Sequence, residues 1–494
     1  MQTSVGRGLT ARSERGTDTM DGEWTFTGDF SKDRLHAQQT LHTDRSADMV
    51  ERRLMLAGRD MTLYYADGLI KDEVMEKMLE FLMKLTPRDV PSDMSAAEFD
   101  RRFVTYVEVG RQKTLRAFGL DVAMGRIGLV IAGFDEAILI EARDYPVRSV
   151  EEPEDDRVLR GPHDGFVETA LFNTAQLRRR IRDPQLINEV LTVGTTSHTD
   201  VFLCYLDGVC PEKLLKKTRA MLQRIDLPTL CMAQEGLNET LARGQWGNPF
   251  PKVRFTERPD AACAAIAEGR LILVVDNSPA AIILPTSVFD FTQDTNDYYF
   301  PPLVGSYLRF VRNAVFLTTL LLTPLWYLLI RHPEAAPDWL SFALIREPNK
   351  VPVIVQLLIA ELIVDGLKLA SLNTPNALSN AFGLIGGLIL GEFAVNVELF
   401  VEQVLLCMAF VAVANFTQPN FELGYAFKLF RLLFLVLIAL LDGWGLLLGL
   451  AIMLVLLVTT RTPVGYNYLY PLIPFNGDAL HRLLLRRPVH RDNC

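Results

Sequence analysis

Apolar and charged positions divide the chain of 494 residues into two unlike halves. Residues 1–300 contain most of the charged side chains, whereas residues 303–460 consist of long runs of Leu, Ile, Val, Phe and Ala with few ionisable groups. Runs of about 20 apolar residues are long enough to cross a lipid bilayer as helices. The pattern therefore predicts a soluble α/β N-terminal half followed by an α-helical, polytopic transmembrane domain at 303–460.

A strand, a tight turn and a helix occur twice in the soluble half. Strand-like runs at 61–69 and 201–209 both contain an Asp-Gly turn, 140 residues apart (207 minus 67), and a segment with helical spacing follows each. Two-strand patterns that begin at Gly125 and Gly269 repeat at 144 residues (269 minus 125). These repeats predict two similar tandem cytoplasmic α/β lobes, at 46–150 and 195–302, the second including a connector.

The remaining segments of the soluble half are polar. Residues 1–45 predict a flexible tail. Residues 151–194 begin with the acidic sequence EEPEDD, which predicts a solvated linker, and continue as a connecting helix that ends in Arg178, Arg179 and Arg180. We interpret these arginines as a solvent-facing basic helix end, and an anion-binding role is the alternative.

The apolar half contains one plain span and several segments with ionisable residues. The clearest spanning helix lies at 313–330. Segments at 352–370, 399–416 and 426–458 also have the composition of membrane helices, and the last is long enough to be either a helical hairpin or a long bent helix. Charges at membrane depth are costly and mark functional or paired groups. The candidate intramembrane charged residues are Glu361, Asp365, Lys368, Glu402 and Asp442.

Asp365 and Lys368 are three residues apart, so they can neutralise one another along a helix face. A transport role for these charges is an equally weighted alternative. The segment 381–395 contains Gly383, Gly387 and Gly391 at four-residue spacing, with Glu392 beside the last glycine. Such a smooth stripe permits close helix association in lipid. We therefore interpret these four residues as candidate pore or assembly positions, and packing within one monomer is the alternative for the glycines.

The ends of the chain predict its orientation. The N-terminus lacks the apolar core of a signal peptide, and the segment 461–494 is rich in arginine. The positive-inside rule places this basic tail in the cytoplasm. We expect both termini to be cytoplasmic and the chain to cross the membrane four times, with one further segment interfacial or re-entrant.

Composition and motifs argue against several functions. The formal net charge of −9 opposes a nucleic-acid surface, and the six cysteines show neither a CxxC pair nor metal-ligand spacing. There is no Gly-rich phosphate loop, GxSxG elbow or HExxH motif, and the Asp-Gly turns are explained by turn geometry. We therefore expect no enzymatic activity, no cofactor and no metal.

Five motifs resemble the GerA family, the A-subunit type of spore germinant receptors. The resemblance covers residues from about 48 to 490. Its most specific stretches are RGPHDGFVETALFNTAQLRRRIRDPQL at 160–186, LTVGTTSHTDVFLCYLDGV at 191–209, VVDNSPAAIILPTSVFDF at 274–291, DYYFPPLVGSYLRFVR at 297–312 and GLIGGLILGE at 383–392. The segment PLIPFNGDALHRLLLRRP at 471–488 departs from the nutrient-receptor tail and resembles the stage V sporulation protein AF branch.

The resemblance implies a spore germination protein of the spore inner membrane. It implies assembly into an oligomer through the membrane domain, a small membrane-protein partner, and flux of monovalent cations during germination. The hypothesis that follows is a non-enzymatic subunit of an oligomeric cation channel or receptor complex. The alternatives are a transporter or accessory factor for dipicolinic acid movement, and a membrane scaffold that does not conduct ions.

Overall fold

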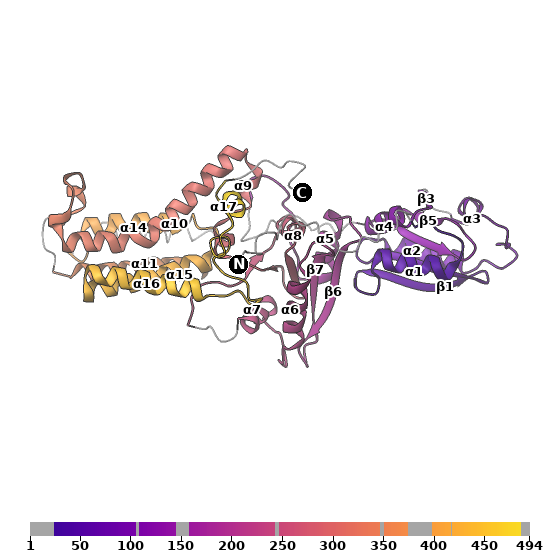
Figure 1. Ribbon diagram of the computed structural model, residues 1–494, viewed down its shortest axis with the longest axis horizontal. Coiled ribbons are helices and arrows are strands. Elements are labelled where there is room, and N and C mark those ends of the chain that lie inside the picture. The colour runs from indigo at the N-terminus through magenta and orange to yellow at the C-terminus, as the bar shows by residue number, and fades with distance from the viewer. Residues whose placement is uncertain are drawn as a thin grey trace, which may run out of the picture. The chain divides into compact units, whose positions relative to one another are not determined.

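A computed structural model describes residues 24–104, 108–144, 158–242, 247–345, 350–373, 398–415 and 417–485. They belong to two compact units, which we describe separately (Figure 1). The first unit comprises Met1–Arg157, Pro162–Leu237 and Phe255–Ile283, and contains most of two β-sheet lobes. The second comprises Val158–Gly161, Asn238–Arg254 and Leu284–Cys494, and contains the long apolar helices.

The first lobe is a five-stranded antiparallel sheet with helices on both faces. Its strands are β1 (Met49–Leu56), β2 (Arg59–Ala66), β3 (Val109–Gln112), β4 (Ile127–Ile131) and β5 (Ala137–Ile140), in the order β1-β2-β4-β5-β3. Helices α1 (Phe30–Leu41) and α4 (Leu115–Ala123) cover one face. Residues of α2 (Asp72–Leu82) and α3 (Ala96–Phe103) cover the other. Successive strand residues point to opposite faces, so Leu63 joins one core and Tyr64 the other.

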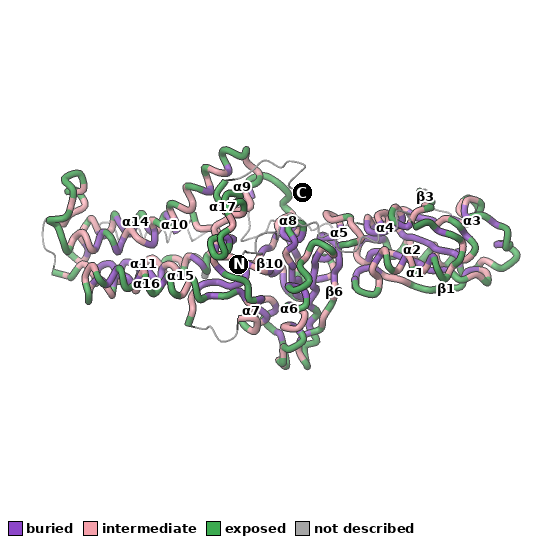
Figure 2. The backbone as a smooth tube through the Cα atoms, in the orientation of Figure 1, coloured by how far each residue is buried: buried purple, intermediate pink, exposed green. Residues whose placement is uncertain are grey.

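The second lobe repeats this topology. Its strands are β6 (Leu186–Val193), β7 (Thr199–Leu206), β8 (Arg254–Thr256), β9 (Leu271–Val275) and β10 (Ala281–Leu284), in the order β6-β7-β9-β10-β8. Helices α5 (Ala170–Arg180) and α8 (Pro259–Ala267) pack on one face. The lobe also contains α6 (Glu212–Gln223), and α7 (Ala233–Leu241) follows it in the chain. Figure 2 shows buried residues along the inner strands of both lobes, and β4, β5, β9 and β10 are buried throughout.

Matching glycines explain why the repeat is visible in the sequence. Gly125 has a φ of 96° and Gly269 a φ of 83°, and both angles disfavour any residue with a Cβ. A Cβ on Gly125 would lie 3.0 Å from the carbonyl oxygen of Leu69, and one on Gly269 would lie 3.0 Å from that of Val209. The same tight approach therefore follows the Asp-Gly turn in both lobes, which confirms the prediction of two similar lobes.

The interpretation of Arg178 as a solvent-facing residue is wrong. Arg178 is fully buried, and its Nε donates to Oδ2 of Asp48, at the start of the first lobe, over 3.0 Å. Its Nη2 donates to the carbonyl oxygen of Leu186 over 2.8 Å, and Asn188 Nδ2 donates to Asp48 over 2.9 Å. The last turn of α5 thus joins the two lobes through a buried ion pair, in which Asp48 and the carbonyl oxygen of Leu186 take the place of solvent around Arg178.

The second unit contains the apolar helices. They are α10 (Pro302–Arg331), α11 (Val353–Asn373), α14 (Glu402–Asn415), α15 (Phe421–Leu441) and α16 (Gly443–Thr459). They are preceded by the 3₁₀ helix η1 (Val288–Thr292) and α9 (Asn296–Tyr299), interrupted after α10 by η2 (Pro333–Ala335) and η3 (Asp338–Ala343), and followed by α17 (Gly477–Leu484). Among the described residues, α10 and α15 are long and apolar enough to cross a membrane, and α14 and α16 are shorter apolar helices.

The segment 426–458 forms a helical hairpin rather than one bent helix. Helix α15 ends at Leu441 and α16 begins at Gly443, with Asp442 between them at a φ of 55°. A Cβ on Gly445 would lie 2.0 Å from the carbonyl oxygen of Leu437. Gly449 faces Phe434 in the same way, so the two helices run antiparallel and pack at close range.

Candidate intramembrane charge site

Four charged side chains meet in the middle of the helical unit. Glu361 of α11 forms a bidentate ion pair with Arg431 of α15, with distances of 2.6 Å to Nε and 2.9 Å to Nη2. Lys428 Nζ lies 3.3 Å from Glu361 Oε2 and also contacts the carboxylate of Asp365. The cluster contains two acids and two bases, so its formal charges cancel.

The spacing of these residues explains the geometry. Glu361 and Asp365 are separated by four residues, and Lys428 and Arg431 by three, so each pair lies on one helix face. Helix α11 meets α15 in opposite directions, since Glu361 contacts Arg431 and Asp365 contacts Lys428. The antiparallel alignment therefore places each acid beside a base.

A third helix completes the site. Arg431 Nη1 donates to the carbonyl oxygen of Thr319 in α10 over 2.9 Å. Arg431 is the central residue of α15, ten residues from each end (431 minus 421, and 441 minus 431). At a rise of about 1.5 Å per residue, it lies roughly 15 Å from either end of the helix. If α15 crosses the bilayer, the cluster lies at the depth where water is scarcest.

Lys368, one turn beyond Asp365, lies with its Nζ 5.6 Å from the centre of the Tyr425 ring. This is the geometry of a cation–π contact. The ion pair of Asp365 with Lys428 joins two helices, whereas the predicted pair with Lys368 would have stayed within one. Lys428 and Arg431 were not among the residues predicted from the sequence, although two bases on one face of an otherwise apolar segment were a usable signal.

The other predicted charges lie outside the cluster. Glu402 is the exposed first residue of α14. Asp442 caps the tip of the hairpin, where its Oδ2 lies 2.8 Å from His332 Nε2 and its Oδ1 lies 3.6 Å from Arg331 Nε. Gly383, Gly387, Gly391 and Glu392 lie outside the described residues.

A second buried ionic group lies where α10 begins. Asp297 of α9 is fully buried and accepts hydrogen bonds from Arg312 Nη1 and Nη2 over 2.8 and 2.9 Å. Arg309 is also buried, with its Nε 3.4 Å from Asp297. Arg309 Nη1 donates to the carbonyl oxygen of Leu483, near the end of α17, over 2.9 Å. We call Asp297, Arg309 and Arg312 the connector clamp, because they fix the segment before α10 and the helix α17 to α10.

These features define a class of protein: a membrane protein with a duplicated antiparallel α/β module and a helical domain that buries compensated charges. The chain belongs to the family described as Bacillus/Clostridium GerA spore germination protein, whose model matches residues 36–493. This confirms the resemblance drawn from the motifs.

Relatives from bacilli share most of the chain. Stage V sporulation protein AF of Bacillus subtilis is 35% identical over 441 residues, which cover 89% of both chains. Spore germination protein A1 of the same organism is 28% identical over 446 residues, covering 90% of this chain and 91% of the relative. The crystal structure of the N-terminal domain of the A subunit of the Bacillus megaterium spore germinant receptor GerK3 is also similar, with 23% identity and a TM-score of 0.42; the match covers 53% of this chain and 96% of that chain.

Proposed function

We propose that the protein is a subunit of an oligomeric cation channel in the spore inner membrane, which promotes ion release during germination. The observation that carries the proposal is the charge cluster of Glu361, Asp365, Lys428 and Arg431 at the centre of α11 and α15. A helix that only anchors a soluble module gains nothing from such charges, since each costs roughly 2.5 to 3.5 kcal/mol at the bilayer centre on insertion scales. Charged residues within membrane segments are rare, and they commonly belong to proteins that contain ion or substrate pathways, where they pair with one another.

We propose different roles for the acids of the cluster and for Glu392. Glu361 and Asp365 are neutralised by bases of the same monomer, so they hold α10, α11 and α15 together rather than attract a passing cation. Glu392 remains the proposed acid of the conducting path, and Gly383, Gly387 and Gly391 the proposed seam between subunits. Acidic rings that attract cations are a common way to build such a path.

The connector clamp supports gating from the cytoplasmic side. The residues that follow β10 lead through η1 and α9 into α10, and Asp297 ties this connector to α10 through Arg309 and Arg312. A displacement of the connector is therefore passed to α10 without a flexible hinge at this point. The proposal includes cytoplasmic termini, a small membrane-protein partner and monovalent cations as the permeant ions.

Potassium release from liposomes that contain the purified full-length protein tests the proposal. We expect release above that of empty liposomes, and a changed rate or selectivity for Glu392→Gln. A chain truncated before residue 303 keeps the lobes and lacks the helices, so retained germination activity in that variant would identify a scaffold instead.

A further inference from the structure

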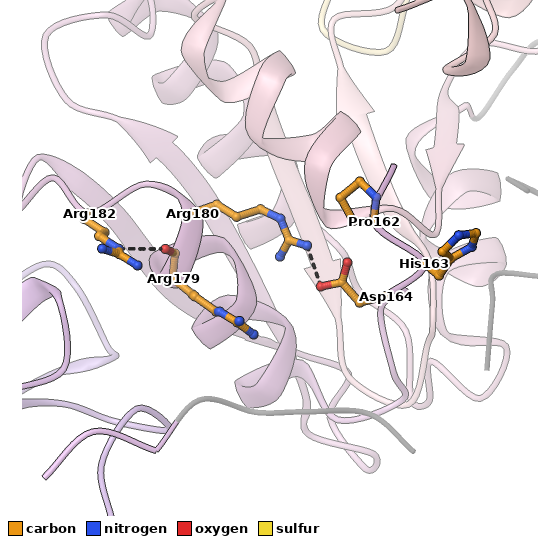
Figure 3. Close-up of a pocket in the computed structure, with 6 residues that line it drawn as sticks. All are labelled: Pro162, His163, Asp164, Arg179, Arg180 and Arg182. Carbon is orange, nitrogen blue, oxygen red and sulfur yellow. Dashed lines mark hydrogen bonds and ion pairs between the residues drawn. The ribbon is translucent and has the colours of Figure 1, made fainter. Parts of the chain in front are cut away.

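A pocket of about 470 Å³ lies on the second lobe, beside the end of α5. This volume lies within the range of small-molecule sites, about 300 to 1,000 Å³. Its lining is unusually rich in arginine: Pro162, His163, Asp164, Arg179, Arg180 and Arg182 (Figure 3). Three arginines and one aspartate give the lining a formal excess of two positive charges, with His163 counted as neutral.

One wall of the pocket is held rigidly. Arg258, which is fully buried, donates from Nη2 to the carbonyl oxygen of Pro162 over 2.9 Å. Further along the same segment, Gln176 Nε2 donates to the carbonyl oxygen of Gly165 over 3.2 Å, and Asn173 Nδ2 to that of Val167 over 2.6 Å. The segment 162–167 is therefore fixed to α5 and to Arg258 along its length. A pre-organised wall reduces the conformational cost of binding a ligand.

Arginine side chains of the pocket already contact oxygen atoms of the chain. Arg180 Nη2 lies 2.5 Å from Oδ2 of Asp164, so one carboxylate already occupies one guanidinium of the pocket. Arg182 Nε donates to the carbonyl oxygen of Arg179 over 3.2 Å, which holds the side chain of Arg182 against the backbone at the end of α5 (Figure 3). Planar guanidinium groups bind carboxylates through two parallel hydrogen bonds, which a lysine cannot form.

We propose that this pocket binds a small dicarboxylate, with Arg179 and Arg182 as the residues that hold its carboxylates. The pair of Arg180 and Asp164 forms the adjoining wall and adds one more donor group. The excess of two positive charges matches a dianion. This inference does not depend on ion conduction, because it concerns binding to the second lobe alone.

Calorimetric titration of the purified full-length protein with succinate tests the proposal, with succinamide as the uncharged control. We expect saturable binding of succinate, weakened at least tenfold in Arg179→Ala and in Arg182→Ala, with no saturable binding of succinamide. The lysine variants at both positions keep the charge and lose the bidentate geometry, so their affinities should be intermediate. Arg101→Ala, which removes an exposed arginine of α3 in the first lobe, is the matched control and should bind as the wild type does.

The acidic sequence EEPEDD at 151–156, a few residues before Pro162 in the chain, also contains carboxylate groups. A variant with these five acids changed to amides separates the two sources of carboxylate. Tighter binding of succinate to this variant would mean that the chain's own carboxylates compete for the pocket, and equal affinity would mean that the free dianion is the ligand; both results support the site. Absence of saturable binding in both proteins, or binding that survives loss of Arg179 and Arg182, would overturn it.

Discussion

At the scale of single residues, two buried arginines hold distant parts of the chain together. Arg178 binds Asp48 from the other lobe, and Arg431 binds Glu361 from another helix. Each also donates to a backbone carbonyl, of Leu186 and of Thr319 respectively. These added acceptors matter because the attraction within a buried ion pair only about offsets the cost of removing its charges from water. Removing one partner of such a pair therefore destabilises the folded protein far more than removing both.

Glu361→Gln and Arg431→Met should each destabilise the protein by roughly 3 to 5 kcal/mol, because either change leaves a buried charge without its main partner. The double variant should be more stable than the sum of the two losses predicts. Denaturant unfolding in detergent measures these free energies.

Glu398→Gln is the control for this cycle, since Glu398 forms an exposed ion pair with Lys350. It should unfold as the wild type does. Wild-type stability for Arg431→Met would contradict the assignment of the charge cluster as the contact that holds α10, α11 and α15 together.

His42 predicts a pH dependence in the first unit. Desolvation by burial, followed by the positive charge of Arg45, lowers the pKa of His42 below its usual 6.5. The unfolded chain therefore takes up a proton before the folded chain does, so stability is highest above pH 6.5 and falls as the pH drops toward the folded-state pKa. Thermal unfolding between pH 7.5 and about 5 measures the loss.

His42→Asn should flatten this pH profile, because asparagine tolerates the positive φ of 51° at this helix end and does not titrate. His198→Asn is the matched control, since His198 also has a positive φ but is exposed. A profile that is equally steep in both variants would show that His42 is not the titrating group.

At the scale of elements, glycines decide how closely helices approach. Gly445 lies against the backbone of Leu437, whereas a Cβ on Gly443 would meet nothing within 4 Å. Two glycines only two residues apart in the same helix are thus in opposite situations. Gly445 belongs to the interface of α15 and α16, and Gly443 faces open space.

Gly445→Ala should destabilise the hairpin by roughly 1 to 3 kcal/mol, because the added methyl group forces the helices apart. Gly443→Ala is the matched control and should change the stability little. Crosslinking between cysteines introduced on α15 and α16 would report the separation. Equal crosslinking in the two alanine variants would show that α16 does not pack against α15 at Gly445.

Structural features that depend on residues close together in the sequence could be predicted. The Asp-Gly turns and the glycines at 125 and 269 indicated the duplicated lobes, because each lobe needs these backbone angles at the same places. The prediction for Arg178 was wrong, because its partner Asp48 lies 130 residues earlier and no local pattern indicates the contact between them. The spacing of Lys428 and Arg431 was a local signal, but their acidic partners on α11 could not be predicted from it. Their role depends on the alignment of α15 with α11, which only the packing of the helices defines.

At the scale of the whole molecule, the proposed gating depends on the connector clamp, which fixes the segment before α10 and the helix α17 to α10. Asp297 contacts both Arg309 and Arg312, and Asp294 also lies 3.6 Å from Arg312. Asp297→Asn weakens both ion pairs and loosens the attachment of α9 and α17 to α10. We expect faster amide hydrogen exchange at 288–300 and 477–485 in this variant, with the sheet strands of the lobes unchanged. Unaltered exchange at 477–485 would separate α17 from the clamp.

Single-channel recording from planar bilayers that contain the purified full-length protein tests directly whether the protein conducts cations. We expect discrete, cation-selective conductance steps, with a smaller cation conductance for Glu392→Gln because the proposed acid of the path is neutralised. A protein that inserts into the bilayer in its oligomeric form and shows no conductance under any condition would contradict it.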